Sequence, residues 1–130
     1  MKALSRVAGT LLLCAMLSCD NGASEPSGPG KISVQLSGTS LPTNALVLSV
    51  TGGPITSISG TGGNSASQFS TSSTNTRILV IGAINDGLLM ELNVPDVSQD
   101  YTVTVLDAAG GQSTGYRANV TSSYYVTVER

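Results

Sequence analysis

Few side chains in this 130-residue chain could carry acid–base or nucleophilic chemistry. The chain has no histidine, which is the usual general base, the usual partner of a Ser or Cys nucleophile, and a common zinc ligand. Lys31 is the only lysine after the second residue, and it lies beside a Gly/Pro-rich stretch where a buried Ser–Lys pair is not expected. We therefore predict no enzyme activity, no catalytic residue and no cofactor.

Carboxylates are the remaining groups that could act in pairs. A glycosidase needs two of them beside the bond that it cleaves. We expect Glu91 on an outward strand face and the aspartates at turns, where Asp is common because its side chain bonds nearby backbone. Solvated turn residues are the favoured interpretation. The candidates are Glu91, Asp96, Asp100 and Asp107.

Turn residues with oxygen side chains also raise the question of calcium, which prefers oxygen ligands. Asn85-Asp86 and the segment 96–100 could supply such ligands, but the spaced D-x-D-x-D-G pattern is absent. We therefore predict no metal site.

Tyr116, Tyr124 and Tyr125 could stack on a sugar. Strand alternation places the adjacent pair on opposite faces, which favours one core tyrosine and one ordinary surface tyrosine.

The N-terminal residues have the layout of an export signal. Lys2 and Arg6 supply positive charge, and the stretch from Val7 to Leu17 is almost entirely apolar. A secretory signal peptide has this order, with a basic start, a short apolar core and a small residue before the cleavage point. About eleven apolar residues are too few for a membrane-spanning helix, which needs roughly 20. The pattern predicts export without a transmembrane anchor.

The stretch Met16-Leu17-Ser18-Cys19 resembles the lipobox of bacterial lipoproteins. In that family a small residue precedes a cysteine that is acylated and becomes the mature N-terminus. Ser18 and Cys19 occupy these two positions, and Met16 stands where leucine is usual. The resemblance implies a lipoprotein signal peptide at residues 1–18 and lipidation of Cys19.

The cysteine count agrees with this interpretation. The chain has two cysteines, so Cys19 would be the only one left after cleavage, and a lone thiol in an exported protein needs an explanation. Cys14 fits the lipidated position less well because Leu13, which precedes it, is bulky. The alternative is a plain secreted protein in which Cys19 is incidental.

Residues 19–30 are expected to form a flexible tether. After the cysteine they are small, polar and rich in Gly and Pro, a composition that cannot pack a core.

Beyond residue 18 the chain carries four basic and eight acidic side chains, a net charge of −4. Because nucleic acids and anionic lipid head groups attract basic surfaces, we predict neither as a partner. The membrane would instead be reached through the lipid on Cys19.

Residues 31–130 predict one all-β domain, a single antiparallel β-sandwich of seven to nine short strands. Apolar and polar residues alternate over 32–36, 46–50, 101–105 and 124–128, which is the pattern of strands with one buried face. About 100 residues suffice for one hydrophobic core.

The middle of the chain gives further expectations. Residues 78–81 are continuously apolar, which predicts either burial on both faces or a central strand of the sandwich. The Asn-Asp-Gly sequence at 85–87 predicts a tight hairpin. Residues 60–75 are expected to form a long loop that contains a short strand around 68–71, with Phe69 folded onto the core, and residues 107–111 another turn. The pattern of residues 112–120 is weak and predicts an edge strand around Tyr116 and Ala118. The inward residues of the strand after the hairpin are expected to be Leu88, Met90, Leu92 and Val94.

The order of elements from Ala45 to Val128 loosely resembles that of cohesin-like β-sandwich domains of bacterial extracellular proteins. This resemblance implies the sandwich fold and carries no binding motif. It rests on residues 45–50, 55–58, 77–92 with the Asn-Asp-Gly turn, and 101–105.

These features predict a non-catalytic, lipid-anchored protein of the bacterial cell envelope, facing the periplasm or the cell surface. It would act as a binding or structural module with a protein or polysaccharide partner. The alternative is a periplasmic lipoprotein that binds a small ligand or carbohydrate through the Gly/Ser/Thr-rich region 60–75.

Overall fold

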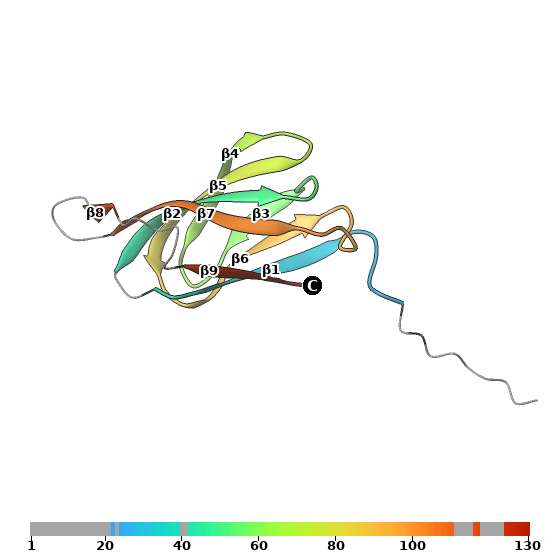
Figure 1. Cartoon of the computed structure of the whole chain (residues 1–130), viewed down its shortest axis with the longest axis horizontal. Coiled ribbons are helices and arrows are strands. Elements are labelled where there is room, and N and C mark those ends of the chain that lie inside the picture. Colours follow the sequence, from blue (N-terminus) through green and yellow to red (C-terminus); the bar gives the residue numbers. More distant parts are fainter. Residues whose placement is uncertain (1–21, 23, 40–41, 111–115, 118–123) are drawn as a thin grey trace, which may run out of the picture.

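The computed structural model describes residues 22, 24–39, 42–110, 116–117 and 124–130. These residues form nine strands and no helix (Figure 1). The strands are β1 (Gly30–Ser37), β2 (Thr43–Thr51), β3 (Ser57–Gly60), β4 (Ser65–Thr71), β5 (Asn75–Ile84), β6 (Gly87–Val94), β7 (Thr102–Gly110), β8 (Tyr116–Arg117) and β9 (Tyr125–Glu129).

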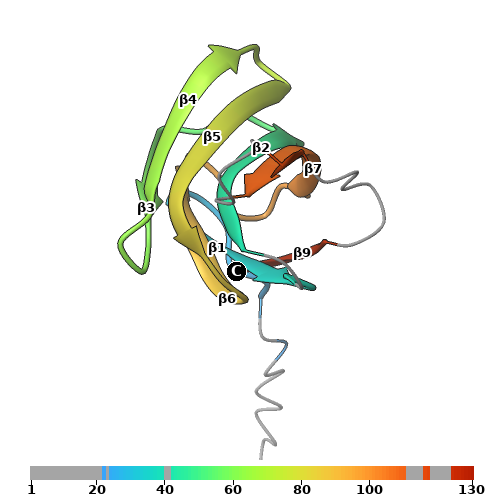
Figure 2. The same cartoon turned by 90° about the vertical axis from the view of Figure 1, so that its left-hand side faces the viewer.

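The strands divide into two sheets that pack face to face. One sheet has the order β3-β6-β1-β9 and the other the order β4-β5-β2-β7-β8. Every described strand pair is antiparallel. Figure 2 shows the two layers nearly end-on, with β4, β5 and β2 above β1 and β6. The all-β antiparallel sandwich of seven to nine strands is therefore confirmed.

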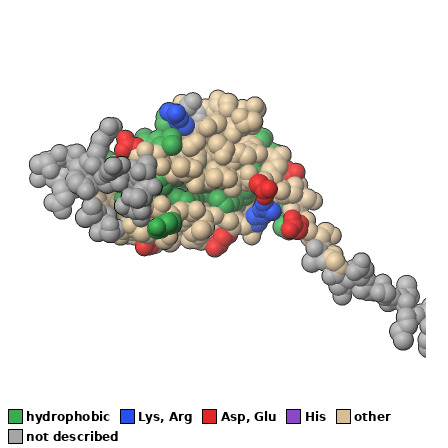
Figure 3. Space-filling view, in the orientation of Figure 1, with side chains coloured by type: hydrophobic (Ala, Val, Ile, Leu, Met, Phe, Trp, Pro, Cys, Tyr) green, Lys and Arg blue, Asp and Glu red, His purple; other side chains and the backbone are tan. Residues whose placement is uncertain are grey.

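The core between the sheets is built from aliphatic side chains at alternate strand positions. The inward residues predicted for 32–36, 46–50 and 101–105 are all buried, and Leu48 is fully so. Val126 and Val128 of the edge strand β9 pack against this core while partly buried. In Figure 3 the side of the core appears as a green band between β7 and β9.

Strand β5 agrees with one of its two interpretations. It is an interior strand of the sandwich, paired with β2 and β4. Its burial alternates, with Ile78 and Val80 fully buried and Ile81 52% exposed. Burial on both faces is wrong because the other sheet packs only on the inner face of this one.

The connection at 85–87 joins the two sheets instead of closing a hairpin. Gly87 has the positive φ (119°) expected of this turn, but β5 and β6 belong to different sheets. Figure 2 shows β5 leading into β6 at the side of the sandwich. A turn sequence reports local backbone geometry and does not specify which strands pair, so the hairpin prediction fails.

Bulges account for the remaining errors of register. The β1–β6 ladder shifts between Val34 and Gln35, which leaves Leu89 as an extra residue on β6. Leu89 is therefore buried and Leu88 is 40% exposed, the reverse of the prediction for these two positions, whereas Met90 is buried as expected. An extra residue changes the face of every side chain beyond it.

A second β-bulge lies in β7. Its ladder with β2 shifts so that Leu106 is the extra residue, and the strand continues to Gly110. The turn predicted over 107–111 therefore lies within the strand for its first four residues, while residue 111 lies outside the described part. The weak strand predicted around Tyr116 and Ala118 appears as β8, and Ala118 also lies outside that part.

The short strand expected around 68–71 is present but longer, so residues 60–75 are mostly strand and not mainly loop. β4 occupies Ser65–Thr71 and pairs with β5. Phe69 is the extra residue of a further bulge and is 57% exposed. It does not plug the core, because at this edge of the sheet it lies on the outer face.

We expect Leu48→Ala to lower the free energy of unfolding by about 2–5 kcal/mol, because it removes buried atoms and leaves a cavity. Leu48 is 0% exposed in the central strand β2. Leu88→Ala, at a 40% exposed site, should change stability by no more than about 1 kcal/mol. Urea denaturation of both variants tests this. Equal losses of unfolding free energy would contradict the exposure assigned to Leu88 in β6.

Candidate functional site

Hydrogen bonds around Asp96 fix the chain where it enters the sandwich. We call this group of residues the clasp; it comprises Gly28, Asp96, Val97 and Ser98. The backbone N–H of Gly28 donates to Asp96 Oδ1 (3.0 Å), and the Gly28 carbonyl accepts from the N–H of Val97 (2.9 Å). Residues 24–27 before this point are exposed. The described part of the predicted tether 19–30 therefore ends at Gly28, two residues before β1 begins. Cys19 and the predicted signal peptide 1–18 lie outside the described residues.

The clasp depends on an ionised carboxylate. The hydroxyl of Ser98 donates to Asp96 Oδ1 (2.7 Å), and the Ser98 N–H does so as well (2.9 Å). These bonds, followed by the one from Gly28, hold the pKa of Asp96 below its usual value. Hydrogen bonds that favour the charged form lower a carboxyl pKa. Asp96 therefore ties the 95–99 turn and the tether exit together.

The other candidate carboxylates also have local partners. Glu91 forms an ion pair with Lys31 (3.1 Å), and Asp100 forms one with Arg130 (2.5 Å). Asp107 Oδ1 accepts from the N–H of Ala108 (2.9 Å). None of the four candidate carboxylates lines the hollow between β3 and β4 that is described below. Their chemistry is that of turns and surface ion pairs.

The residues considered as calcium ligands also form local hydrogen bonds. Asp86 accepts hydrogen bonds from the hydroxyl and then the backbone N–H of Thr39, which lower its pKa. Asn85 donates its amide to the Ala83 carbonyl (3.2 Å). Across the described residues, no group of three Asp, Glu, His or Cys side chains could hold a metal ion.

The tyrosines behave as the alternation predicts. Tyr124 is partly buried and shares a hydrogen bond with Thr43 (2.5 Å between hydroxyl oxygens), whereas Tyr125 is 68% exposed. The two lie on opposite faces of the sheet edge and cannot form one stacking platform. The side chain of Tyr116 is not among those described.

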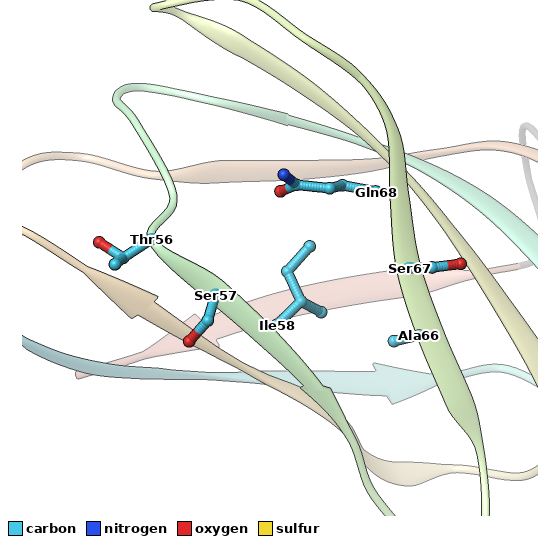
Figure 4. Close-up of a pocket in the computed structure, with 6 residues that line it drawn as sticks. All are labelled: Thr56, Ser57, Ile58, Ala66, Ser67 and Gln68. Atoms are coloured by element: carbon cyan, nitrogen blue, oxygen red, sulfur yellow. The ribbon is translucent and has the colours of Figure 1, made fainter.

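A hollow of about 160 Å³ lies between β3 and β4. These strands are edges of different sheets, and no ladder closes the gap between them. Figure 4 shows Ile58 projecting into the gap, with Ala66 and Gln68 pointing toward it and Ser67 turned away. The lining residues are Thr56, Ser57, Ile58, Ala66, Ser67 and Gln68.

The lining is uncharged. Ile58 and Ala66 are packed against the core and form an apolar floor. Ser57 is held by the amide of Asn93 (2.7 Å), while the exposed Gln68 amide and Thr56 hydroxyl offer donors and acceptors at the rim. Such a surface suits a small neutral ligand with hydroxyl or amide groups and cannot perform acid–base chemistry.

The sequence predicted only one of the two segments that line this hollow. Residues 66–68 lie inside the Gly/Ser/Thr-rich region predicted to bind a ligand, but residues 56–58 precede it. Residues 56–58 and 66–68 come together because the turn between β3 and β4 crosses from one sheet to the other at the side of the sandwich. The sequence around Thr56 contains no signal for that packing.

No family model, no curated protein and no solved structure matches this chain. No helix in the described residues is long and apolar enough to cross a membrane.

The clasp predicts a pH dependence. Because the pKa of Asp96 is lower in the folded than in the unfolded state, its contribution to stability is present above the unfolded value of about 3.9 and is lost as pH falls through the folded value. We expect Asp96→Asn to weaken the dependence of stability on pH below about pH 4. Ser98→Ala should weaken it in the same direction. Denaturation curves measured from pH 2 to 6 test this, and an unchanged pH dependence in both variants would refute the clasp.

Proposed function

We propose that the protein is a non-catalytic lipoprotein of the bacterial cell envelope that serves as a binding or structural module for a protein or polysaccharide. The observation that carries this proposal is the Met16–Cys19 stretch, which follows a basic and apolar leader and precedes a small, polar segment. Two or more acyl chains anchor a protein stably, at about 0.8 kcal/mol per buried CH₂.

The geometry of the domain is compatible with this anchor. From Cys19 to Gly28 an extended chain reaches about 30 Å, enough to hold the sandwich clear of a bilayer surface. In Figure 1 the described tether residues leave at the right end of the sandwich, beside the C-terminus, and β8 lies at the opposite end. The end with β8 and the 85–87 turn would then face away from the membrane.

The anchor is tested by producing the full-length chain in bacteria fed with labelled palmitate. We expect label on the wild type and on Cys14→Ala, and none on Cys19→Ala, because Cys14 would be removed with the signal peptide. Protease treatment of intact cells then distinguishes a surface-exposed from a periplasm-facing protein. Label on Cys19→Ala, or none on the wild type, would refute the anchor.

The second candidate function is the binding of a small neutral ligand or carbohydrate in the β3–β4 hollow, and the uncharged rim with its apolar floor favours it. A ligand that binds only the folded state stabilises it by about 2.7 kcal/mol at 100 times its Kd. Thermal unfolding with a panel of neutral sugars and amides should therefore identify a binder. We expect Gln68→Ala to abolish the shift and Gln35→Ala, on the outer side of β1, to retain it.

A further inference from the structure

The sandwich is least closed on the side between β7 and β9. Val103 and Val105 of β7 are each 8% exposed, the highest values in the buried core of the described residues, and Val126 and Val128 of β9 are only partly buried. We call these four valines the seam. The green band in Figure 3 lies along this side. The edge of the core is therefore accessible between the two strands.

Polar contacts join the two sheets at both ends of the seam. At one end a hydrogen bond (2.5 Å) links the hydroxyls of Thr43, which begins β2, and Tyr124, which precedes β9. At the other end Arg130, which follows β9, forms an ion pair (2.5 Å) with Asp100, shortly before β7. The seam therefore lies between two fixed points.

The backbone of β7 has no ladder partner along most of its outer edge in the described residues. β8 pairs only with residues 109–110. In an antiparallel ladder, successive residues turn their N–H and C=O groups alternately to one side and to the other. The Ser72 N–H donates to the Asn75 carbonyl (2.7 Å), which fixes this alternation for β5, and the ladders extend it through β2 to β7. The N–H and C=O groups of Val103 and Val105 consequently point to the open edge.

Ala108 agrees with this alternation and shows how part of the edge is protected. Beyond the bulge at Leu106 the Ala108 N–H points outward, and it donates to Asp107 Oδ1 (2.9 Å). No described ladder pairs the outward groups of Val103 and Val105 in this way. Residues 102–106 also lack the charges and prolines that protect many edge strands. This part of the edge is open to a further strand.

The edge of β9 has the same property. The Thr61 N–H donates to the Leu89 carbonyl (3.3 Å), which fixes the alternation for β3, and the ladders extend it through β6 and β1 to β9. The backbone groups of Val126 and Val128 therefore point away from β1. Within the described residues, both edges of the seam present N–H and C=O groups that repeat about every 7 Å without a ladder partner.

We propose that the seam binds an extended peptide segment of a partner protein, which adds to β7 as an antiparallel strand in line with β8. Addition of a strand to an exposed sheet edge is a common mode of peptide recognition, in which the main chain supplies the hydrogen bonds. Alternating N–H and C=O groups complement another polypeptide backbone, whereas a neutral polysaccharide offers hydroxyls without this alternation. The inference rests on the binding role proposed above and selects a protein as the partner.

The valine side chains favour a separate peptide over a second copy of the chain. In an antiparallel pair, the peptide residues opposite Val103 and Val105 turn their backbone groups to β7 and their side chains to the inner face of the sheet. Apolar side chains at these positions would cover Val126 and Val128. A second copy that paired through its own β7 could not do so, because its valines at 103 and 105 already pack in its own core.

The probe for this site is a short peptide in which threonine and valine alternate, with a lysine at each end for solubility. We expect it to bind the full-length chain, purified in detergent, with a Kd below about 1 mM, because backbone pairing does not require one particular sequence. Hydrogen exchange resolved to single residues should slow at least about tenfold at the amides of Val103 and Val105. The amide of Gln68, beside the β3–β4 hollow, should change little.

Two N-methylated forms of this peptide are matched controls for each other. The apolar seam sets the register in which the valines point inward. N-methylation of the valines removes the N–H groups that face β7 and should weaken binding more than about tenfold, the effect of losing two net hydrogen bonds. N-methylation of the threonines, whose N–H groups face away from β7, should weaken binding much less.

Val128→Lys provides a second arm. It places a charged side chain over the seam and should weaken binding of the unmethylated peptide about tenfold or more. Thr127→Lys adds the same charge on the exposed outer side of β9 and should retain binding. If Val128→Lys does not fold, the two methylated peptides still test the site on the unsubstituted chain.

The remaining outcomes would overturn the proposal. These are no binding of the unmethylated peptide, equal binding of the two methylated forms, or protection at Gln68 instead of Val103. Slow exchange at Val103 and Val105 in the free chain would also overturn it, and a particle of twice the mass in light scattering would then identify a second copy as the occupant. Palmitate label on Cys19 without peptide binding would leave the anchor and remove this site. Peptide binding without label would do the reverse.

Discussion

The whole structure depends on burying one side of each main strand against the opposite sheet. After residue 18 the chain has a single cysteine, and its described acidic side chains form no metal site. Aliphatic packing between the sheets and backbone ladders within them hold the described strands together. Ile32, Leu48 and Ile78 are completely excluded from solvent. Because a sandwich of this size has only one core, a cavity there affects both sheets at once.

Short polar side chains hold the connections in place. Asp96 ties the tether exit to the 95–99 turn, and Asp86 ties the 85–87 crossover to Thr39. The hydroxyl of the buried Tyr101 donates to the carbonyl of Pro54 (2.9 Å) and fixes the segment between β2 and β3. These contacts explain why aspartates stand at positions 86 and 96, in the connections between strands. They stabilise loops that some other small domains close with disulfides.

The regions available for interaction are those where the regular sandwich is interrupted. The β3–β4 hollow exists because the two edge strands belong to different sheets. Bulges at Phe69 and Leu106 turn large apolar side chains outward beside a sheet face that is already rich in alanine, valine and leucine. Both features lie on the domain and not on the tether.

The sequence by itself determined the fold class, the location of the core and most strand positions, because period-2 alternation over 32–36, 46–50 and 101–105 leaves few other solutions. It also identified Cys19 as the candidate anchor, a local pattern that needs no tertiary contact. Only the tertiary structure decided which strands pair, that β5 leads into the other sheet, and that Leu89 and not Leu88 is buried. Sheet partners are chosen by long-range packing, and one bulged residue reverses the faces of a strand without changing its composition.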